Sequence, residues 1–319
     1  MSFQYTSITD PEWLATNRQT GQDDYILVKP TDYSNVPIAI PNWEPLPCCT
    51  STMFRRYERE LLNFQVKSDD VWIASYPKSG TTWVQEMVWL ICNDLDFEKA
   101  RTTVIRDRSP FLEVSTIFDI GEEESSFVFT SEAPSPRFIK THLPVALLPP
   151  NIWAVKPKIV YIRRNPKSVG VSYFHHSVRA NFNGTKEAFI RMFMKDLQFY
   201  SPFHQHVIEY NELASYDNLL NLCYEDMKRD LKSSVIRTCE FFDKNYSDET
   251  INELCRHLSF ESMTNNLAVN YEDVFPDEKF IREGMIDGWK KELSPELIAE
   301  MDHWTENTVA EKYRHLFKV

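Results

Sequence analysis

One stretch of sequence decides the fold of this chain: Val71-Trp72-Ile73-Ala74-Ser75-Tyr76-Pro77-Lys78-Ser79-Gly80-Thr81-Thr82-Trp83. Its first six residues form a short apolar run, which is typical of a buried parallel strand. Pro77 to Gly80 interrupts this run, and from Thr81 onward the apolar residues recur at the spacing of a helix. The stretch therefore predicts a strand, then a loop with one lysine and one glycine, and then the N-terminus of a helix.

The loop between this strand and this helix has the groups that bind a phosphate. Gly80 lets backbone N–H groups approach an anion at a helix N-terminus, where the helix dipole favours negative charge. Lys78 adds a cation, and Ser79 and Thr81-Thr82 add hydroxyls. The order differs from the G-x-x-x-x-G-K-[ST] loop, because here the lysine precedes a lone glycine. A capped helix with a solvated lysine is the alternative, but Trp83 can stack on a nucleobase and favours nucleotide binding.

Strands and helices are predicted to alternate along the rest of the chain. Further strands are predicted at 137–141, 158–162 and 219–224. Helices are predicted at 53–62, 167–180, 186–198, 203–214, 227–242, 248–256 and 295–313. This alternation predicts one α/β domain with a central parallel β-sheet flanked by helices, in a P-loop-like nucleotide-binding topology. Residues 1–52 contain many prolines and little periodicity, and we expect an extended N-terminal arm packed on the body, 53–319.

Composition and charge exclude several classes of protein. The chain is 42% hydrophobic, which is too apolar for a disordered protein. Its net charge of −12 argues against non-specific binding to nucleic acid or to an anionic membrane. The sequence has neither a continuous apolar stretch of membrane-spanning length nor a signal-peptide core in residues 1–29. The six cysteines lack metal-ligand spacing, so we expect reduced thiols, no metal site and a cytoplasmic location.

Four segments, in order, resemble the cytosolic sulfotransferases of animals. Residues 76–83 resemble that family's 5′-phosphosulfate loop, and Lys140-Thr141-His142-Leu143-Pro144 resembles the segment with its catalytic histidine. Tyr161-Ile162-Arg163-Arg164-Asn165-Pro166-Lys167, with Val171-Ser172-Tyr173, resembles the 3′-phosphate segment. Tyr224-Glu225-Asp226-Met227-Lys228 resembles a segment that contacts adenosine. The four segments lie between residues 70 and 290, at spacings similar to those of the family.

The resemblance implies a donor nucleotide and the residues that hold it. The family's donor is 3′-phosphoadenosine 5′-phosphosulfate (PAPS), its product is 3′-phosphoadenosine 5′-phosphate (PAP), and no metal is needed. Residues 53–319 would form the sulfotransferase domain. Within it, residues 78–82 would hold the 5′-phosphate. Arg164 and Ser172 would hold the 3′-phosphate. The adenine site would be lined by Trp83, Tyr224 and Phe260.

The chain departs from the family at the far end of this donor site. The family usually has Arg-Lys-Gly, two residues, and Gly-Asp-Trp-Lys, where this chain has Arg282-Glu283-Gly284-Met285-Ile286-Asp287-Gly288-Trp289-Lys290. Glu283 would repel a phosphate, so we expect its side chain to point away and Arg282 and the N–H of Gly284 to make the contact. Ser294-Pro295 replaces a Thr-Val pair of the family's dimerisation motif, which leaves a homodimer open but alters its usual motif.

Sulfonate transfer needs a base for the acceptor and positive charge for the leaving phosphate. A neutral histidine is the natural base near pH 7. His142 follows a predicted strand, at the edge of the sheet where ligands of open α/β folds bind. Lys78 and Lys140 are predicted to stabilise the oxygens that gain charge, and Ser172 to hydrogen-bond Lys78.

The acceptor is predicted to be a small lipophilic molecule with a hydroxyl group, such as a phenol, a steroid or another alcohol. Apolar walls are predicted from Phe54, Pro77, Phe111, Leu112 and Phe174. The pair His175-His176 is interpreted as two histidines on a helix surface, with an acceptor contact as the alternative.

Three other functions stay open at this point. A dehydratase would sulfonate an allylic alcohol and then eliminate sulfate. A nucleotide-binding regulator without turnover would explain Glu283 and the inverted pair Asp287-Gly288. A P-loop kinase would bind ATP with magnesium, but the chain has no pair of acids placed after a strand to hold that ion.

Overall fold

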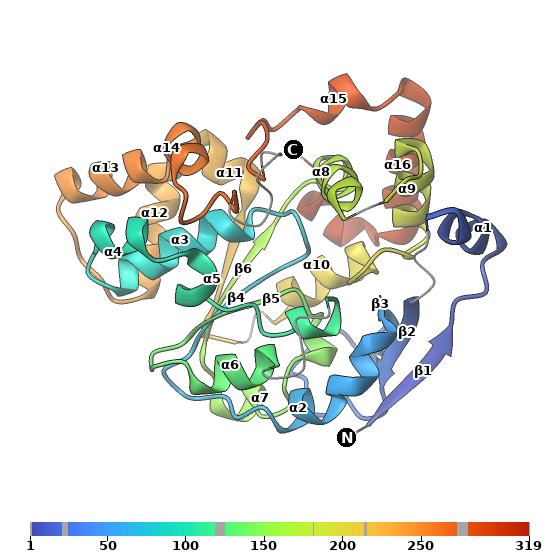
Figure 1. The fold of residues 1–319 in the computed structure, drawn as a ribbon, viewed down its shortest axis with the longest axis horizontal. Coiled ribbons are helices and arrows are strands. Elements are labelled where there is room, and N and C mark those ends of the chain that lie inside the picture. Colours follow the sequence, from blue (N-terminus) through green and yellow to red (C-terminus); the bar gives the residue numbers. More distant parts are fainter. Residues whose placement is uncertain are drawn as a thin grey trace.

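A four-stranded parallel sheet lies at the centre of this computed structural model, which describes residues 2–20, 25–118, 125–180, 182–213, 216–272 and 280–318 (Figure 1). The strands are β4 (Val71–Ser75), β5 (Phe138–Thr141), β6 (Lys158–Arg163) and β7 (Leu219–Cys223). Their order across the sheet is β5-β4-β6-β7, and every neighbouring pair is parallel. The predicted parallel sheet is therefore confirmed, with strand ends that differ from the predicted ones by a residue or two.

Alternate residues of β4 face two separate hydrophobic cores. Val71 and Ile73 belong to the core that includes helix α3, whereas Trp72 and Ala74 belong to the core on the opposite face. Every residue of β4 is buried, which explains why its sequence is apolar throughout and does not alternate.

Helices cover both faces of the sheet (Figure 1). On one side lie α3 (Thr81–Cys92), α11 (Tyr224–Arg229), α12 (Leu231–Phe241), α13 (Asp248–His257) and α14 (Phe260–Asn265). On the other lie α8 (Pro166–Arg179), α9 (Lys186–Met194), α10 (Phe203–Glu212) and α16 (Pro295–Thr308). The shorter helices are α4 (Phe97–Thr102), α5 (Ile105–Arg108), α6 (Ser126–Glu132), α7 (Ile152–Val155) and α15 (Trp289–Glu292). Among the helices that the structure describes, none has the length and apolar character needed to cross a membrane.

Three predicted helices are divided or shortened. The helix predicted at 227–242 is two helices, because Asp230 ends α11 and its side chain caps α12 by accepting the N–H of Ser233 at 3.0 Å. The helix predicted at 53–62 is a 3₁₀ turn, η1 (Thr52–Tyr57), followed by α2 (Glu58–Asn63). The helix predicted at 295–313 ends at 308, and a 3₁₀ turn, η4 (Glu311–Leu316), follows it.

Residues 1–52 are more regular than the extended arm that the sequence predicted. They contain a three-stranded antiparallel sheet of β1 (Phe3–Ser7), β2 (Tyr25–Pro30) and β3 (Cys48–Ser51), and helix α1 (Pro11–Thr20). Every second residue of β2 is buried, which is the alternation expected of a strand. This alternation was not recognised in the sequence, because it extends over only six residues in a segment with many prolines. Tyr25 stacks on Phe199 at 4.1 Å, and Trp13 Nε1 donates to the carbonyl of Leu197 at 3.3 Å.

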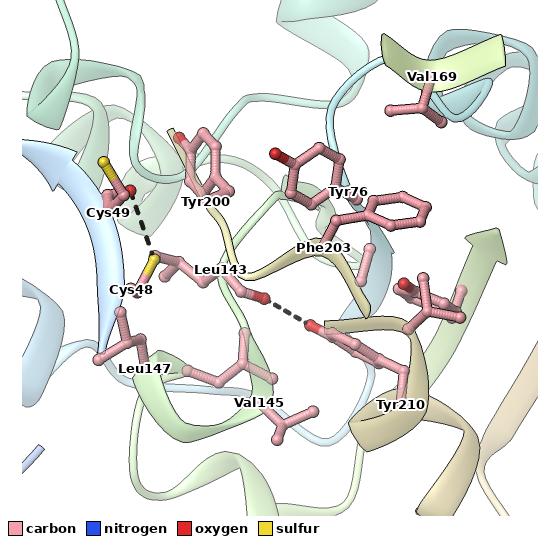
Figure 2. Packing of buried hydrophobic residues seen from close by; sticks show 14 of the residues in the cluster. Cys48, Cys49, Tyr76, Leu143, Val145, Leu147, Val169, Tyr200, Phe203 and Tyr210 are labelled. Atoms are coloured by element: carbon pink, nitrogen blue, oxygen red, sulfur yellow. Dashed lines mark hydrogen bonds between the residues drawn. The ribbon is translucent and has the colours of Figure 1, made fainter. Parts of the chain in front are cut away.

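The core below the carboxyl end of β5 fixes the loop that follows this strand. Figure 2 shows Leu143, Val145 and Leu147 packed among Cys48, Tyr76 and Tyr210 from other elements. The Tyr210 hydroxyl donates to the carbonyl of Leu143 at 2.9 Å. Because buried polar groups need partners, this bond holds the loop after β5 in one conformation.

A buried ion pair joins the starts of β4 and β5. Arg137 donates from Nε and Nη2 to the two carboxylate oxygens of Asp70, at 2.7 and 2.6 Å. Both side chains are at most 1% exposed. Removing one partner of such a pair leaves a buried charge without compensation, which is strongly destabilising.

We therefore expect Asp70→Asn to lower the free energy of unfolding by about 3 kcal/mol or more. Asp243→Asn is the matched control, because Asp243 pairs with Lys158 while its own side chain is 89% exposed. Its loss should cost less than about 1 kcal/mol. Urea unfolding measures both values, and equal effects of the two substitutions would contradict the prediction.

Candidate active site

A cavity of about 970 Å³ lies at the carboxyl edge of the parallel sheet. Parallel strands bring their carboxyl ends to one edge, so the loops after β4, β5 and β6 meet there. Nearly all of the site residues predicted from the sequence line this cavity: Lys78, Gly80, Thr81, Thr82, Trp83, Lys140, His142, Arg164, Ser172, Tyr224, Phe260, Arg282 and Gly284. Ser79 is the exception, because its side chain is fully buried and its backbone N–H donates to the carbonyl of Tyr76.

The loop between β4 and α3 has the backbone shape of an anion cradle. Lys78 and Gly80 both have left-handed backbone conformations, with φ of +67° and +106°. Helix α3 begins at Thr81, and the first N–H groups of a helix have no acceptor within it. A Cβ at Gly80 would lie 2.8 Å from the ring of Tyr224, so only glycine fits between the loop and this aromatic wall.

Several cations converge on this cradle although the chain is acidic overall. Burial, and then the nearby Arg179, Lys140, Arg164 and Arg282, lower the pKa of Lys78 to about 7. Arg164 donates to the carbonyl of Lys78 at 3.1 Å and lies 4.0 Å above the ring of Tyr224. Burial also lowers the pKa of Arg164. Buried cations with so little compensating charge make this end of the cavity a site for a multiply charged anion.

Arg282 is held at the cavity by two acids. Nη1 of Arg282 donates to Glu292 at 2.6 Å and lies 3.4 Å from Glu283. Glu292 also accepts from His175 Nε2 at 2.6 Å and from Lys186 Nζ at 2.7 Å. Burial works against ionisation, but these three donors lower the pKa of Glu292 to about 2. The sequence did not single out Glu292. The expectation that the side chain of Glu283 points away from a bound phosphate stays a prediction.

Gly284 packs directly against the predicted adenine wall. Its φ is +60°, and a Cβ at this position would overlap the ring of Phe260. Ser172 lines the cavity, but in the described structure it makes no hydrogen bond with Lys78. The predicted bond between these two side chains is therefore absent.

His142 has the tautomer of a general base. Its Nδ1 lies 2.7 Å from the carbonyl of Ser75, which can only accept, so Nδ1 carries the proton and Nε2 is left with its lone pair. Burial, and then the charge of Lys140, lower the pKa of His142 well below its usual value. The ring lies edge-on between Phe111 at 5.1 Å and Tyr200 at 5.4 Å. A neutral imidazole with a free Nε2 can take a proton near pH 7.

Two buried residues that the sequence did not reveal hold the backbone of His142. Glu113 Oε1 accepts the N–H of His142 at 2.6 Å. His206 Nε2 donates to the carbonyl of His142 at 3.0 Å, and the hydroxyl of Tyr161 lies 2.9 Å from His206 Nδ1. The sequence around them gave little signal: Glu113 is a single acid between apolar residues, and His206 is the second histidine of His204-Gln205-His206.

The other end of the cavity is apolar. Pro77 and Phe111 line it as predicted. Phe54 and Leu112 do not, because both are buried in the main core, and Phe174 packs against Phe182 and Phe189 instead. The walls are completed by side chains that the sequence did not single out: Val114, Ile117, Phe118, Phe129, Tyr173 and Tyr200.

The interpretation of two surface histidines is wrong for His176. His176 lines the cavity, and burial followed by the charges of Lys78 and Lys140 lowers its pKa well below the usual value. His175 is bound to Glu292 and belongs to the network around Arg282. One turn of α8 thus contributes to the cavity itself and to the support of its rim.

A cationic cradle, a neutral histidine and an apolar end in one cavity define the class of protein as an α/β transferase that uses an anionic nucleotide. The family model for the sulfotransferase domain matches residues 68–315. Luciferin sulfotransferase from Photinus pyralis is 38% identical over 286 residues, which cover 81% of this chain and 76% of that protein. Sulfotransferase 1E1 from Homo sapiens is 36% identical over 268 residues, covering 81% and 90%.

A crystal structure of retinol dehydratase in complex with retinol and PAP has the same fold, with a TM-score of 0.86 and 28% identity over 98% of each chain. The chain belongs to the sulfotransferase family. The resemblance seen in the four sequence segments is thereby confirmed, and the kinase hypothesis has no support.

The packing of Gly284 predicts a selective loss of nucleotide affinity. Gly284→Ala would strain the backbone at positive φ and push Phe260 out of place, so we expect PAP to bind at least about tenfold more weakly. Gly288→Ala is the control, because φ there is −55° and an added Cβ would meet the flexible end of Glu283 at 3.1 Å and Met285 only at ordinary contact distance. Calorimetry with PAP compares the two variants, and equal affinities would contradict the prediction.

The low pKa of Lys78 predicts that anion binding depends on pH. Lys78 is protonated below its pKa of about 7, so PAP should bind most tightly at pH 6.5 and about tenfold more weakly at pH 8.5. Lys78→Arg keeps its charge at both values and should reduce the dependence to the part that Lys140, with a pKa of about 8, contributes. Lys290→Arg, at an exposed position, should retain it. Calorimetry that shows no change with pH in the unmodified protein would refute this prediction.

Proposed function

We propose that this sulfotransferase moves the sulfonate group of PAPS onto the hydroxyl of a small lipophilic acceptor. The observation that carries the proposal is the tautomer of His142, whose free Nε2 faces a cavity with a cationic cradle at one end and apolar walls at the other. A retinol dehydratase of the same fold holds PAP and retinol, which supports a donor nucleotide and a lipophilic alcohol together in one site.

The cradle fits the donor nucleotide in charge and shape. Lys78 is partly exposed to the cavity, and no carboxylate of the described residues forms an ion pair with it, so a phosphate would provide the negative charge that it lacks. Gly80 and Gly284 leave space that a Cβ would fill. The residues that would hold the 5′- and 3′-phosphates and the adenine are the predicted ones that line the cavity: Lys78, Gly80, Thr81, Thr82, Trp83, Arg164, Ser172, Tyr224, Phe260, Arg282 and Gly284. PAPS supplies a sulfonate whose transfer needs no metal.

In this proposal, side chains of the protein accept the proton that the acceptor loses and stabilise the negative charge that develops on the leaving phosphate. His142 Nε2 accepts the proton of the acceptor hydroxyl, while the hydrogen bond from Nδ1 to Ser75 stabilises the imidazolium that forms. Lys78 and Lys140 stabilise the phosphate oxygen that gains charge as the bond to sulfur breaks. Aromatic walls such as Phe111 and Tyr200 exclude water from the reacting atoms.

A second candidate is sulfonation followed by loss of sulfate, as in a dehydratase of an allylic alcohol. The likeness to retinol dehydratase extends over 98% of this chain and therefore includes most of its N-terminal sheet. Product analysis separates the two candidates, because a transferase accumulates a sulfated alcohol and a dehydratase accumulates an alkene. Assays with phenols, steroids, amines and polyisoprenoid alcohols would define the acceptor class.

A cytoplasmic location is part of the same proposal. All six cysteines are free thiols, although Cys48 and Cys49 are adjacent and buried. Free thiols are the rule in reducing compartments, which supports this location.

The role of His142 predicts that His142→Ala abolishes transfer, with a loss of at least about 10²-fold in kcat, because the proposed base for the acceptor proton is gone. PAP binding should change little, since His142 lies at the acceptor side of the cradle. His303→Ala, on the exposed face of α16, is the control.

A transfer assay with labelled sulfate, together with calorimetry, measures both effects. Normal turnover by the His142→Ala variant would contradict this mechanism. An unmodified protein that binds PAP and transfers sulfonate to none of the acceptors would support the non-catalytic regulator instead.

A further inference from the structure

Glu113 is a fully buried acid next to the two proposed catalytic residues of β5 and its loop. Residues 110–112 run beside β5, since Lys140 donates to the carbonyl of Pro110 at 2.9 Å and Leu112 donates to the carbonyl of Lys140 at 3.0 Å. This pairing brings Glu113 to the carboxyl end of β5, just before the 3₁₀ turn η2 (Val114–Thr116). The segment therefore extends the parallel sheet beside the cavity.

The two carboxylate oxygens of Glu113 have different surroundings. Oε1 accepts the backbone N–H of His142 at 2.6 Å. Oε2 is buried and accepts no hydrogen bond of ordinary geometry from the described residues, and the hydroxyl of Tyr200, which interacts with Glu113, also lacks one. A buried carboxylate with one unsatisfied oxygen destabilises the fold, so its presence calls for a functional reason.

The charge of Glu113 acts on Lys140. Burial lowers the pKa of Lys140 to about 8, and Glu113 is the group that opposes this shift. Burial in turn raises the pKa of Glu113 to about 7, opposed by the hydrogen bond from the N–H of His142, by the nearby side chain of Thr141 and by the charge of Lys140. Between these two values the acid is ionised and the lysine is protonated, so each favours the charged form of the other.

We propose that Glu113 is a positioning residue for sulfonate transfer: its Oε1 fixes the backbone of His142, and the pairing of residues 110–112 with β5 places its carboxylate beside Lys140. The inference rests on the proposed roles of His142 and Lys140. It gives a single buried side chain control over both the base and the cation that faces the leaving phosphate.

The backbone of His142 is held from the opposite side by an uncharged group. His206 donates to the carbonyl of His142, and burial lowers the pKa of His206 to about 4, so this imidazole is neutral. His206 can thus position His142, but it cannot supply a negative charge to Lys140. Only Glu113 among the described residues contacts the backbone of His142 and also raises the pKa of Lys140.

The titration of this pair takes place among a defined set of neighbours. The ionisable groups near Glu113 or Lys140 are Cys48, Lys78, His142, His176, Tyr200 and Tyr210. The thiol and the two phenols have pKa values raised by burial and stay neutral, and both histidines have pKa values lowered by burial. Lys78 is therefore the one further cation in this group whose charge changes near the same pH.

Two substitutions separate the hydrogen bond from the charge. Glu113→Gln keeps an oxygen that can accept the N–H of His142 but removes the charge. Glu113→Ala removes both. Glu209→Gln is the matched control, because Glu209 is also fully buried, with a pKa raised by burial to about 7, but bonds Trp43 and Gln205 away from the cavity.

We expect kcat at pH 6.5 to fall about 10²-fold in Glu113→Ala and less than about fivefold in Glu113→Gln, because displacing a catalytic group slightly costs about that factor. The affinity for PAP should stay within about threefold in both variants. As pH rises from 7 to 9, Glu113→Gln should lose activity at a lower pH than the unmodified protein. Glu209→Gln should match the unmodified protein in all three measurements.

A direct titration makes the test independent of turnover. In protein with ¹³C-labelled lysine, NMR should show a lower pKa for Lys140 in Glu113→Gln than in the unmodified protein. An unchanged Lys140 pKa, or a normal kcat in Glu113→Ala, would overturn the inference, as would a loss of PAP affinity in both variants. If the unmodified protein transfers no sulfonate, the proposed function fails, and the Lys140 titration still decides whether Glu113 controls this charge.

Discussion

The parallel register of β4 against β5 and β6 is the constraint on which the site depends. It ends β4 at Ser75, whose carbonyl accepts from His142 Nδ1 while its hydroxyl lies 2.6 Å from that of Thr81. One residue thus ties the proposed base to the start of the phosphate-loop helix. A slip of one residue between β4 and β5 would break this link and turn Lys140 to the other face of the sheet.

Burial of positive charge is the second feature of the site, and it follows from the first. The strands end together, so Lys78, Lys140 and Arg164 line one cavity, and burial lowers the pKa of all three. A ligand that brings negative charge stabilises the charged form of each group. Binding of such a nucleotide therefore stabilises the folded protein as well, by mass action. This local field explains how a chain with a net charge of −12 can bind an anion.

The sequence predicted the parts of the fold and site whose signals are local. The strand, loop and helix around Gly80 could be predicted because thirteen consecutive residues contain the whole signal. Glu113 and His206 could not be predicted, because they lie 29 and 64 residues away from His142 in the sequence, respectively. The N-terminal sheet was missed for the same reason, since β2 shows its period only over six residues and pairs with β1 and β3 far along the chain.

The unusual acid at Glu283 is compatible with an anion site because of how Arg282 is bonded. A guanidinium has five donors, and Nη1 alone serves both Glu292 and Glu283. The remaining N–H groups can still bind a phosphate. Glu292 in turn is kept ionised by three basic partners, His175, Lys186 and Arg282. Its negative charge is shared among these three groups, so Glu292 holds Arg282 at the cavity rim without fully neutralising the charge of this arginine. This chain therefore has an acid, Glu283, where the resemblance implies a second cation, and Glu292 orients the cation that precedes it, Arg282.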